Sequence, residues 1–112
     1  MRRSTPGTWV PAEGLPKNIF LGHTLSALSG VVIYALMGAS AISLGIAVGL
    51  SVFVMASFNA IHPPAGANPI IAILGGKSLS FVLMPVALGA LFIIIFALSV
   101  SNYFFFFFLF FI

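Results

Sequence analysis

The sequence predicts an all-α membrane protein with three transmembrane helices and one short re-entrant or interfacial half-helix. Of its 112 residues 62% are hydrophobic and only 4% are charged. Residues 18–76 and 78–112 contain no Asp, Glu, Lys or Arg. Because a soluble domain carries about 25% charged residues, this composition excludes a soluble enzyme, a nucleic-acid-binding protein and a disordered linker. Only a chain that faces lipid can have so few charges.

The first two expected helices form a hairpin. Residues 19–37 would make a helix about 28 Å long, and residues 41–61 one about 31 Å long, each close to the thickness of the hydrocarbon core. The short link at 38–40 predicts that they are antiparallel neighbours. Residues 1–18 are basic and polar and contain Pro6, Pro11 and Pro16. We expect them to form an irregular leader.

A proline-rich segment follows, with the sequence His62-Pro63-Pro64-Ala65-Gly66-Ala67-Asn68-Pro69. Two adjacent prolines cannot continue a helix. Residues 65–74 have room for about 15 Å of helix, which is half a membrane. We therefore expect a half-helix that does not cross and packs against protein. This layout puts Lys77 on the same side as Arg2, Arg3 and Lys17, as the positive-inside rule prefers.

The last expected span covers residues 79–100 and contains Pro85, a position where a helix can kink. A helix through residue 112 would be about 51 Å long, more than a bilayer core accommodates, so we expect the span to end near Val100. Residues 101–112 are a low-complexity, Phe-rich tail. Our preferred interpretation of the tail is a truncated or misread reading frame, and the alternative is a functional aromatic anchor.

Small residues recur four positions apart in the first two helices. They are Gly22, Ser26 and Gly30, then Ala41, Gly45 and Gly49. Such stripes let helix backbones approach closely in lipid. We interpret them as the seam of the helical hairpin. The alternative is that they line a narrow path for a small solute.

The two histidines are the candidate functional residues. An ionisable side chain within a membrane segment is by default a functional-site candidate, and the alternative is a histidine bonded to a backbone carbonyl. Backbone N–H groups from Gly66 onward, at the start of a half-helix, suit a small anion. A protonatable His62 could couple anion movement to a proton. The alternative here is a rigid turn that merely connects two helices. The predicted substrate-binding residues are His62, Gly66, Ala67, Asn68 and His23.

Other chemistry has no candidates in the sequence. Cysteine is absent and Glu13 is the only acid. The sequence therefore offers no carboxylate pair, catalytic triad or metal-ligand set, and no phosphate-binding fingerprint. We expect no catalytic residue, no metal, no cofactor and no enzymatic activity.

The residues 62–69 closely resemble the signature of the HPP family of integral membrane proteins. The similarity extends from about residue 15 to residue 100. It includes Leu15-Pro16-Lys17-Asn18, Gly22-His23 and Leu25-Ser26-Ala27-Leu28 upstream, and Pro85-Val86 and Leu88-Gly89-Ala90-Leu91 downstream. The resemblance implies a bundle of four transmembrane helices, whose first helix would precede Leu15, so that this chain would form a partial bundle.

The resemblance also implies a function and a location. Some members of the family are described as nitrite carriers, including ones in the chloroplast envelope. The resemblance therefore implies that this chain lies in the plasma membrane or in the chloroplast envelope. His62, Pro63, Pro64, Gly66 and Asn68 would belong to the signature loop, with Asn18 and His23 in the upstream motif. We expect a multi-pass carrier of a small anion such as nitrite, or a fragment of one. The alternatives are a non-transporting scaffold or assembly partner, for which the chain could form a homo-oligomer, and a non-functional truncated reading frame.

Overall fold

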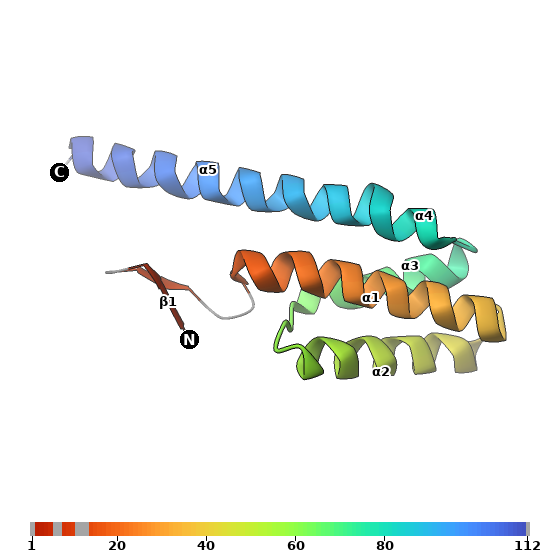
Figure 1. Ribbon diagram of the computed structural model, residues 1–112. Helices are drawn as coiled ribbons and strands as arrows, with labels where there is room; N and C mark the ends of the chain where they lie inside the picture. The colour runs from red at the N-terminus through yellow and green to blue at the C-terminus, as the bar shows by residue number, and fades with distance from the viewer. Residues whose placement is uncertain (1, 6–7, 11–13, 112) are drawn as a thin grey trace.

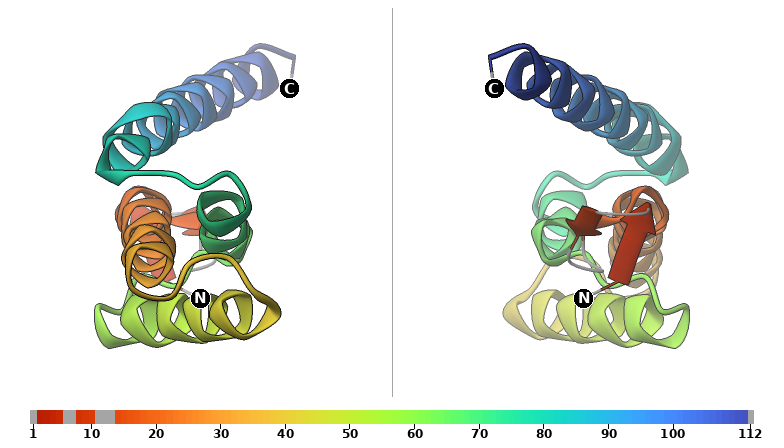
Figure 2. Two further views of the ribbon diagram at one scale, coloured as in Figure 1. Left: turned by 90° about the vertical axis from the view of Figure 1, so that its right-hand side faces the viewer. Right: turned by 90° about the vertical axis from the view of Figure 1, so that its left-hand side faces the viewer.

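The computed structural model describes residues 2–5, 8–10 and 14–111. Its helices form three layers (Figures 1 and 2). Helix α1 (Pro16–Met37) lies in the middle layer beside α3 (Asn68–Leu74), with α2 (Ala41–Ser57) on one side and α5 (Leu88–Phe111) on the other. Helix α1 contacts all of these helices, so it is the centre of the fold.

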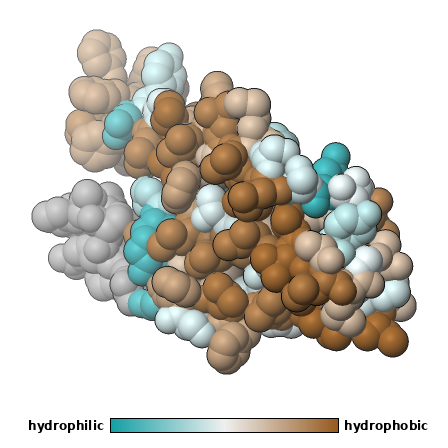
Figure 3. All heavy atoms as spheres, turned by 45° about the vertical axis from the view of Figure 1, so that its right-hand side comes forward, coloured by the Kyte–Doolittle hydropathy of each residue, from teal (hydrophilic) through white to brown (hydrophobic). Residues whose placement is uncertain are grey.

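The helical membrane class agrees with the prediction. Helix α1 and the helical stretch Leu79–Phe111 are long and apolar enough to cross a membrane, and α2 is a shorter apolar helix. Hydrophobic side chains cover most of the face shown in Figure 3. Within the described residues the structure thus gives two candidate spans and one shorter apolar helix.

Two short strands lie near the N-terminus. β1 (Arg2–Thr5) and β2 (Thr8–Val10) pair in antiparallel fashion. The prediction of an irregular leader is wrong for these residues, because Thr and Val favour extended backbone. The rest of the expected leader up to residue 13 lies outside the described residues.

Helix α1 begins three residues earlier than expected, because Pro16 occupies the first position of the helix, where a missing N–H costs nothing. It ends at Met37, where Gly38 has a φ of +70° and donates its N–H to the carbonyl of Tyr34. Helix α2 then starts with a capping box. Ser40 and Ser43 each accept a hydrogen bond from the other's backbone N–H, at 3.1 and 2.8 Å.

Helix α2 ends at Ser57 rather than at residue 61. Asn59 has a φ of +51°, the left-handed conformation that Asn tolerates better than most residues. Its N–H bonds to Ala56 O at 3.0 Å, and Ala60 N–H bonds to Met55 O at 2.8 Å. This is a Schellman motif with Asn at the position where Gly is more usual. The chain therefore turns before it reaches the prolines.

The proline-rich segment runs alongside α1. It forms a 3₁₀ helix, η2 (Pro63–Ala67), followed directly by α3. A Cβ atom at Gly22 would lie 2.7 Å from His62 Cβ, one at Gly30 would lie 2.5 Å from Pro69 Cα, and one at Gly76 would lie 3.0 Å from the Tyr34 hydroxyl. The segment therefore advances from the level of Gly22 to that of Tyr34, in the same direction as α1.

This course corrects two expectations. The segment does not return to its starting level, so the re-entrant one of the two expected forms, re-entrant or interfacial, is wrong. Lys77 follows Gly76 beside Tyr34, whereas Lys17 lies in the first turn of α1. The two lysines therefore lie toward opposite ends of α1, and not on one side as expected. The segment reaches further than expected because Pro63 and Pro64 belong to the 3₁₀ helix η2. A 3₁₀ helix rises about 2.0 Å per residue.

The small-residue stripes pack differently from the prediction. Gly22, Ser26 and Gly30 are buried. Gly30 faces Pro69 and Ala72 of α3, and Gly22 faces His62, Ala60 and the Met55 side chain of α2, so neither glycine faces a glycine of α2. Among the described residues, no atom lies within 4 Å of a Cβ built on Gly45 or Gly49. Helix α2 instead buries Ser43, Ala47, Ser51 and Met55. The prediction of a glycine seam between α1 and α2 is therefore wrong.

The last helical stretch starts with α4 (Leu79–Phe81) and a π-helical turn, η3 (Val82–Ala87), before α5. At Met84, next to Pro85, the backbone is not helical, as expected for a residue that precedes proline. Phe81, Val82 and Val86 pack against α1 and α3.

Helix α5 diverges from α1 and continues to Phe111 (Figure 1). The helix itself therefore continues past Val100, the residue near which we expected the span to end. Residues 101–111 contain no Gly or Pro that would break it. Bilayer thickness limits how much of a helix lies in hydrocarbon, not where its hydrogen bonding stops.

Candidate functional site

The two histidines lie together although 39 positions separate them in the sequence. The ring centroids of His23 and His62 are 5.0 Å apart and the ring planes are inclined at 57°. His23 comes from the second turn of α1, and His62 immediately precedes η2. Gly22 makes the approach feasible, because a Cβ atom there would lie only 2.7 Å from His62 Cβ.

Asn68 connects the start of α3 to this pair. Its Nδ2 atom lies 2.8 Å from Nδ1 of His23, 3.2 Å from Oγ of Ser26 and 3.3 Å from the carbonyl oxygen of His23. Ser26 in turn donates its hydroxyl hydrogen to that carbonyl at 3.1 Å. The cluster formed by His23, Ser26, His62 and Asn68 is called the histidine cluster below.

A second asparagine fixes the chain just before His62. Asn18 is 5% exposed, and its Nδ2 donates to the carbonyl oxygen of Ile61 at 3.0 Å. This hydrogen bond joins the first turn of α1 to the loop that leads to η2. Asn18 thus holds the residue before His62 in place. Its sequence position, at the beginning of an apolar run, indicates this role only weakly.

One polar atom of the histidine cluster stands out. The Nε2 atom of His23 is buried and has no hydrogen-bond partner among the residues that the structure describes. A buried donor or acceptor without a partner costs about 1–3 kcal/mol. Such an atom is therefore a candidate for contact with a ligand.

The structure brings together three of the five predicted binding residues and leaves two outside. Ala67 is exposed, and a Cβ at Gly66 would meet no atom of the described residues within 4 Å. The Asn68 N–H bonds to Ala65 O, and the Ala65 N–H bonds to His62 O. The prediction that free N–H groups begin at Gly66 is therefore wrong for Asn68, because the 3₁₀ turn provides an acceptor for its N–H.

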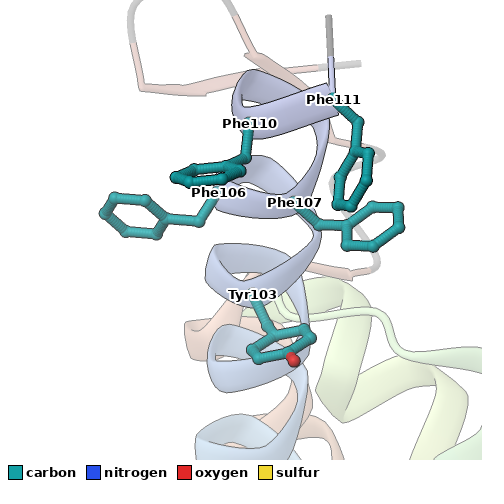
Figure 4. A pocket seen from close by; sticks show the side chains of 5 residues that line it. All are labelled: Tyr103, Phe106, Phe107, Phe110 and Phe111. Atoms are coloured by element: carbon teal, nitrogen blue, oxygen red, sulfur yellow. The ribbon is translucent and has the colours of Figure 1, made fainter.

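Another hollow lies at the far end of α5. Tyr103, Phe106, Phe107, Phe110 and Phe111 line a space of about 230 Å³. Figure 4 shows these rings spread around the outside of a single helix. All five side chains are exposed, so this hollow lacks the walls that a specific site needs. The histidine cluster is the better candidate.

The charge distribution restricts what the histidine cluster can bind. Residues 14–111 of the sequence contain no Asp or Glu. No carboxylate from this stretch can pair with a protonated imidazole or bind a cation. Its side chains offer imidazole, amide and hydroxyl groups instead. These groups can donate hydrogen bonds to a small ligand.

Comparison with known proteins identifies similar sequences. The family model described as "HPP, transmembrane region" matches residues 13–105. Two proteins of Dictyostelium discoideum, each named a transmembrane protein, are 36% and 33% identical over 96 residues, which is 79% of this chain. The chain covers 34% and 31% of their lengths, so it spans about a third of the relatives it matches. No solved structure matches.

Proposed function

We propose that this chain, which belongs to the family of HPP transmembrane regions, carries a small inorganic anion such as nitrite across a membrane. His23 and His62 would contact the anion. The single observation that supports this proposal best is that the two rings lie 5.0 Å apart inside a helical membrane protein. Polar groups within a membrane are costly and are usually retained for function.

The absence of acids from residues 14–111 favours an anion over a cation. A protonated imidazole in a low-dielectric surrounding needs a negative partner nearby. A bound anion would be such a partner. The anion and a proton on the histidine pair would then neutralise each other during passage.

The break in regular α-helix between the end of α2 at Ser57 and the start of α3 at Asn68 supports the same proposal. Many transporters place their substrate site at a discontinuous helix, where irregular backbone lies within the protein. Here η2 and α3 continue alongside α1 after the break. We propose that α2 also crosses the membrane, as the third span, and that η2 with α3 completes the bundle.

The test is uptake of nitrite into proteoliposomes that contain the 112-residue chain. Saturable uptake should fall about tenfold to a hundredfold in His23→Ala and in His62→Ala, because a hydrogen bond to a charged group is worth about 1.5–3 kcal/mol. Phe92→Ala, an exposed change on α5, is the matched control. Absence of uptake by a folded wild-type chain, or full uptake by both folded histidine variants, would refute the proposal.

A second candidate function is a scaffold or a homo-oligomer. The outer face of α2 favours it, since Gly45 and Gly49 are exposed beside Ile42, Ile46 and Phe53. Small residues on such a face allow another helix to pack closely in lipid. Cross-linking in bilayers would then show oligomers that Gly45→Leu abolishes while nitrite flux is absent.

The resemblance leaves the plasma membrane and the chloroplast envelope as locations of the protein. Fractionation of cell membranes would decide between them.

A further inference from the structure

We infer that Asn68 is a positioning residue that fixes His23 in one tautomer, with hydrogen on Nε2, and that this N–H group is the donor for the bound anion. The second half of the inference rests on the proposed function. The first half depends on the geometry of the histidine cluster alone.

The orientation of the Asn68 amide follows from its neighbours. The carbonyl oxygen of His23 can only accept a hydrogen bond. The Ser26 hydroxyl gives its hydrogen to that same carbonyl, so its oxygen also acts as an acceptor toward Asn68. Turning the amide over would place its own oxygen against both acceptors. The NH₂ group of Asn68 therefore faces His23 and Ser26.

The tautomer of His23 follows from the amide orientation. The Asn68 Nδ2 atom is 2.8 Å from His23 Nδ1, which is a full hydrogen-bond distance. Since the amide nitrogen is the donor, Nδ1 must supply a lone pair and carries no hydrogen. A neutral imidazole has one N–H group, so the hydrogen is on Nε2.

The position of Nε2 then indicates what the site binds. This atom is buried and has no hydrogen-bond partner in the described part of the chain. The two hydrogens of the Asn68 NH₂ group are directed at three acceptors on α1. The amide therefore has no hydrogen left for a ligand and acts through His23. A small anion that accepts a hydrogen bond fits the Nε2–H group, whereas a cation does not.

Nitrogen NMR of the chain in lipid bilayers tests the tautomer directly. The sequence contains two histidines, so ¹⁵N-histidine labelling gives two imidazoles and His62→Gln leaves the signals of His23. The measurement concerns the neutral imidazole of His23, which has one N–H group. The spectrum should show Nδ1 without hydrogen and Nε2 with hydrogen. Hydrogen on Nδ1 in the wild type would overturn the inference.

Replacement of the amide tests the positioning role. Asn68→Asp puts an acceptor-only group against Nδ1, so the hydrogen of His23 should move from Nε2 to Nδ1. Asn59→Asp makes the same chemical change at an exposed residue outside the histidine cluster and should leave the His23 signals unchanged. A folded Asn68→Asp chain that keeps hydrogen on Nε2 would contradict the inference. If this variant does not fold, the wild-type spectrum decides.

Titration with sodium nitrite tests the ligand contact, with sodium gluconate to match ionic strength. The Nε2 signal of His23 should shift saturably with nitrite and not with gluconate. Uptake of nitrite without any shift at Nε2 would overturn the contact and leave the proposed transport intact. A saturable shift without uptake would support the binding site and refute transport. The two proposals therefore fail in distinguishable ways.

Discussion

Gly22 of α1 and His62, the residue that precedes η2, are in direct contact. A Cβ atom on Gly22 would lie 2.7 Å from the Cβ of His62 and 3.1 Å from the carbonyl oxygen of Ala60. Both distances are shorter than ordinary van der Waals contact. The position of the second histidine therefore depends on the absence of a side chain at residue 22, one position before the first histidine.

Gly22→Ala should destabilise the protein by about 1–3 kcal/mol, the usual effect of overpacking, and should separate the two imidazole rings. Gly45→Ala is the matched control, because its Cβ would meet no atom of the described residues within 4 Å. Thermal unfolding in detergent, followed by circular dichroism, measures the stability of both variants. Equal stability of the two variants would contradict the close contact between Gly22 and His62.

Gly30→Ala should be at least as harmful as Gly22→Ala, at about 1–3 kcal/mol or more. Its Cβ would lie 2.5 Å from the Cα of Pro69, and backbone cannot rotate away as a side chain can. The expected result is a lower unfolding temperature with α3 displaced from α1. Gly49→Ala serves as control on the open face of α2, and a Gly30→Ala chain as stable as this control would refute the close contact.

Asn18→Asp should cost about 1–3 kcal/mol in the free energy of unfolding. The buried amide that donates to Ile61 O at 3.0 Å would be replaced by an acceptor that faces another acceptor. Asn59→Asp makes the same change at an exposed residue whose left-handed backbone Asp also tolerates. Denaturant titration of both variants should therefore show a large loss for the first and little for the second.

Ser40→Ala should lower the stability of α2 by about 1 kcal/mol, because it removes the side-chain acceptor at the start of the helix. The Ser43 N–H that bonds to Ser40 Oγ at 3.1 Å would lose its partner. Hydrogen exchange of the first turn of α2 should rise in this variant. Ser57→Ala, at the exposed end of the same helix, should leave that exchange unchanged.

Substitutions in the tail should leave the rest of the protein unaffected. Phe106 and Phe110 are 70% and 90% exposed, and α5 diverges from the other helices before it reaches them (Figure 1). Phe106→Ala and Phe110→Ala should change the free energy of unfolding by no more than about 0.5 kcal/mol. A larger loss would show that the rings pack against the protein.

Local signals in the sequence were sufficient for several features. The scarcity of charge predicted a helical membrane protein, Gly38 predicted where α1 ends, and residues 62–69 identified the family. The end of α2 was not predicted, because the Schellman motif at Asn59 depends on a left-handed residue that is usually Gly. The course of η2 and α3 was not predicted either, since a 3₁₀ turn that starts with two prolines has no distinctive hydrophobic period.

The candidate site shows the same limit. The sequence by itself determined which residues are polar within the apolar segments, because burying them in lipid is costly and their presence is visible in composition. Only the tertiary structure decided which of them meet. A small-residue stripe indicates that a helix face is closely packed but does not identify the partner. Gly22 faces His62 and Gly30 faces α3, while no described atom lies within 4 Å of a Cβ built on Gly45 or Gly49. The pairing of His23 with His62 and Asn68 depends on that choice of partner.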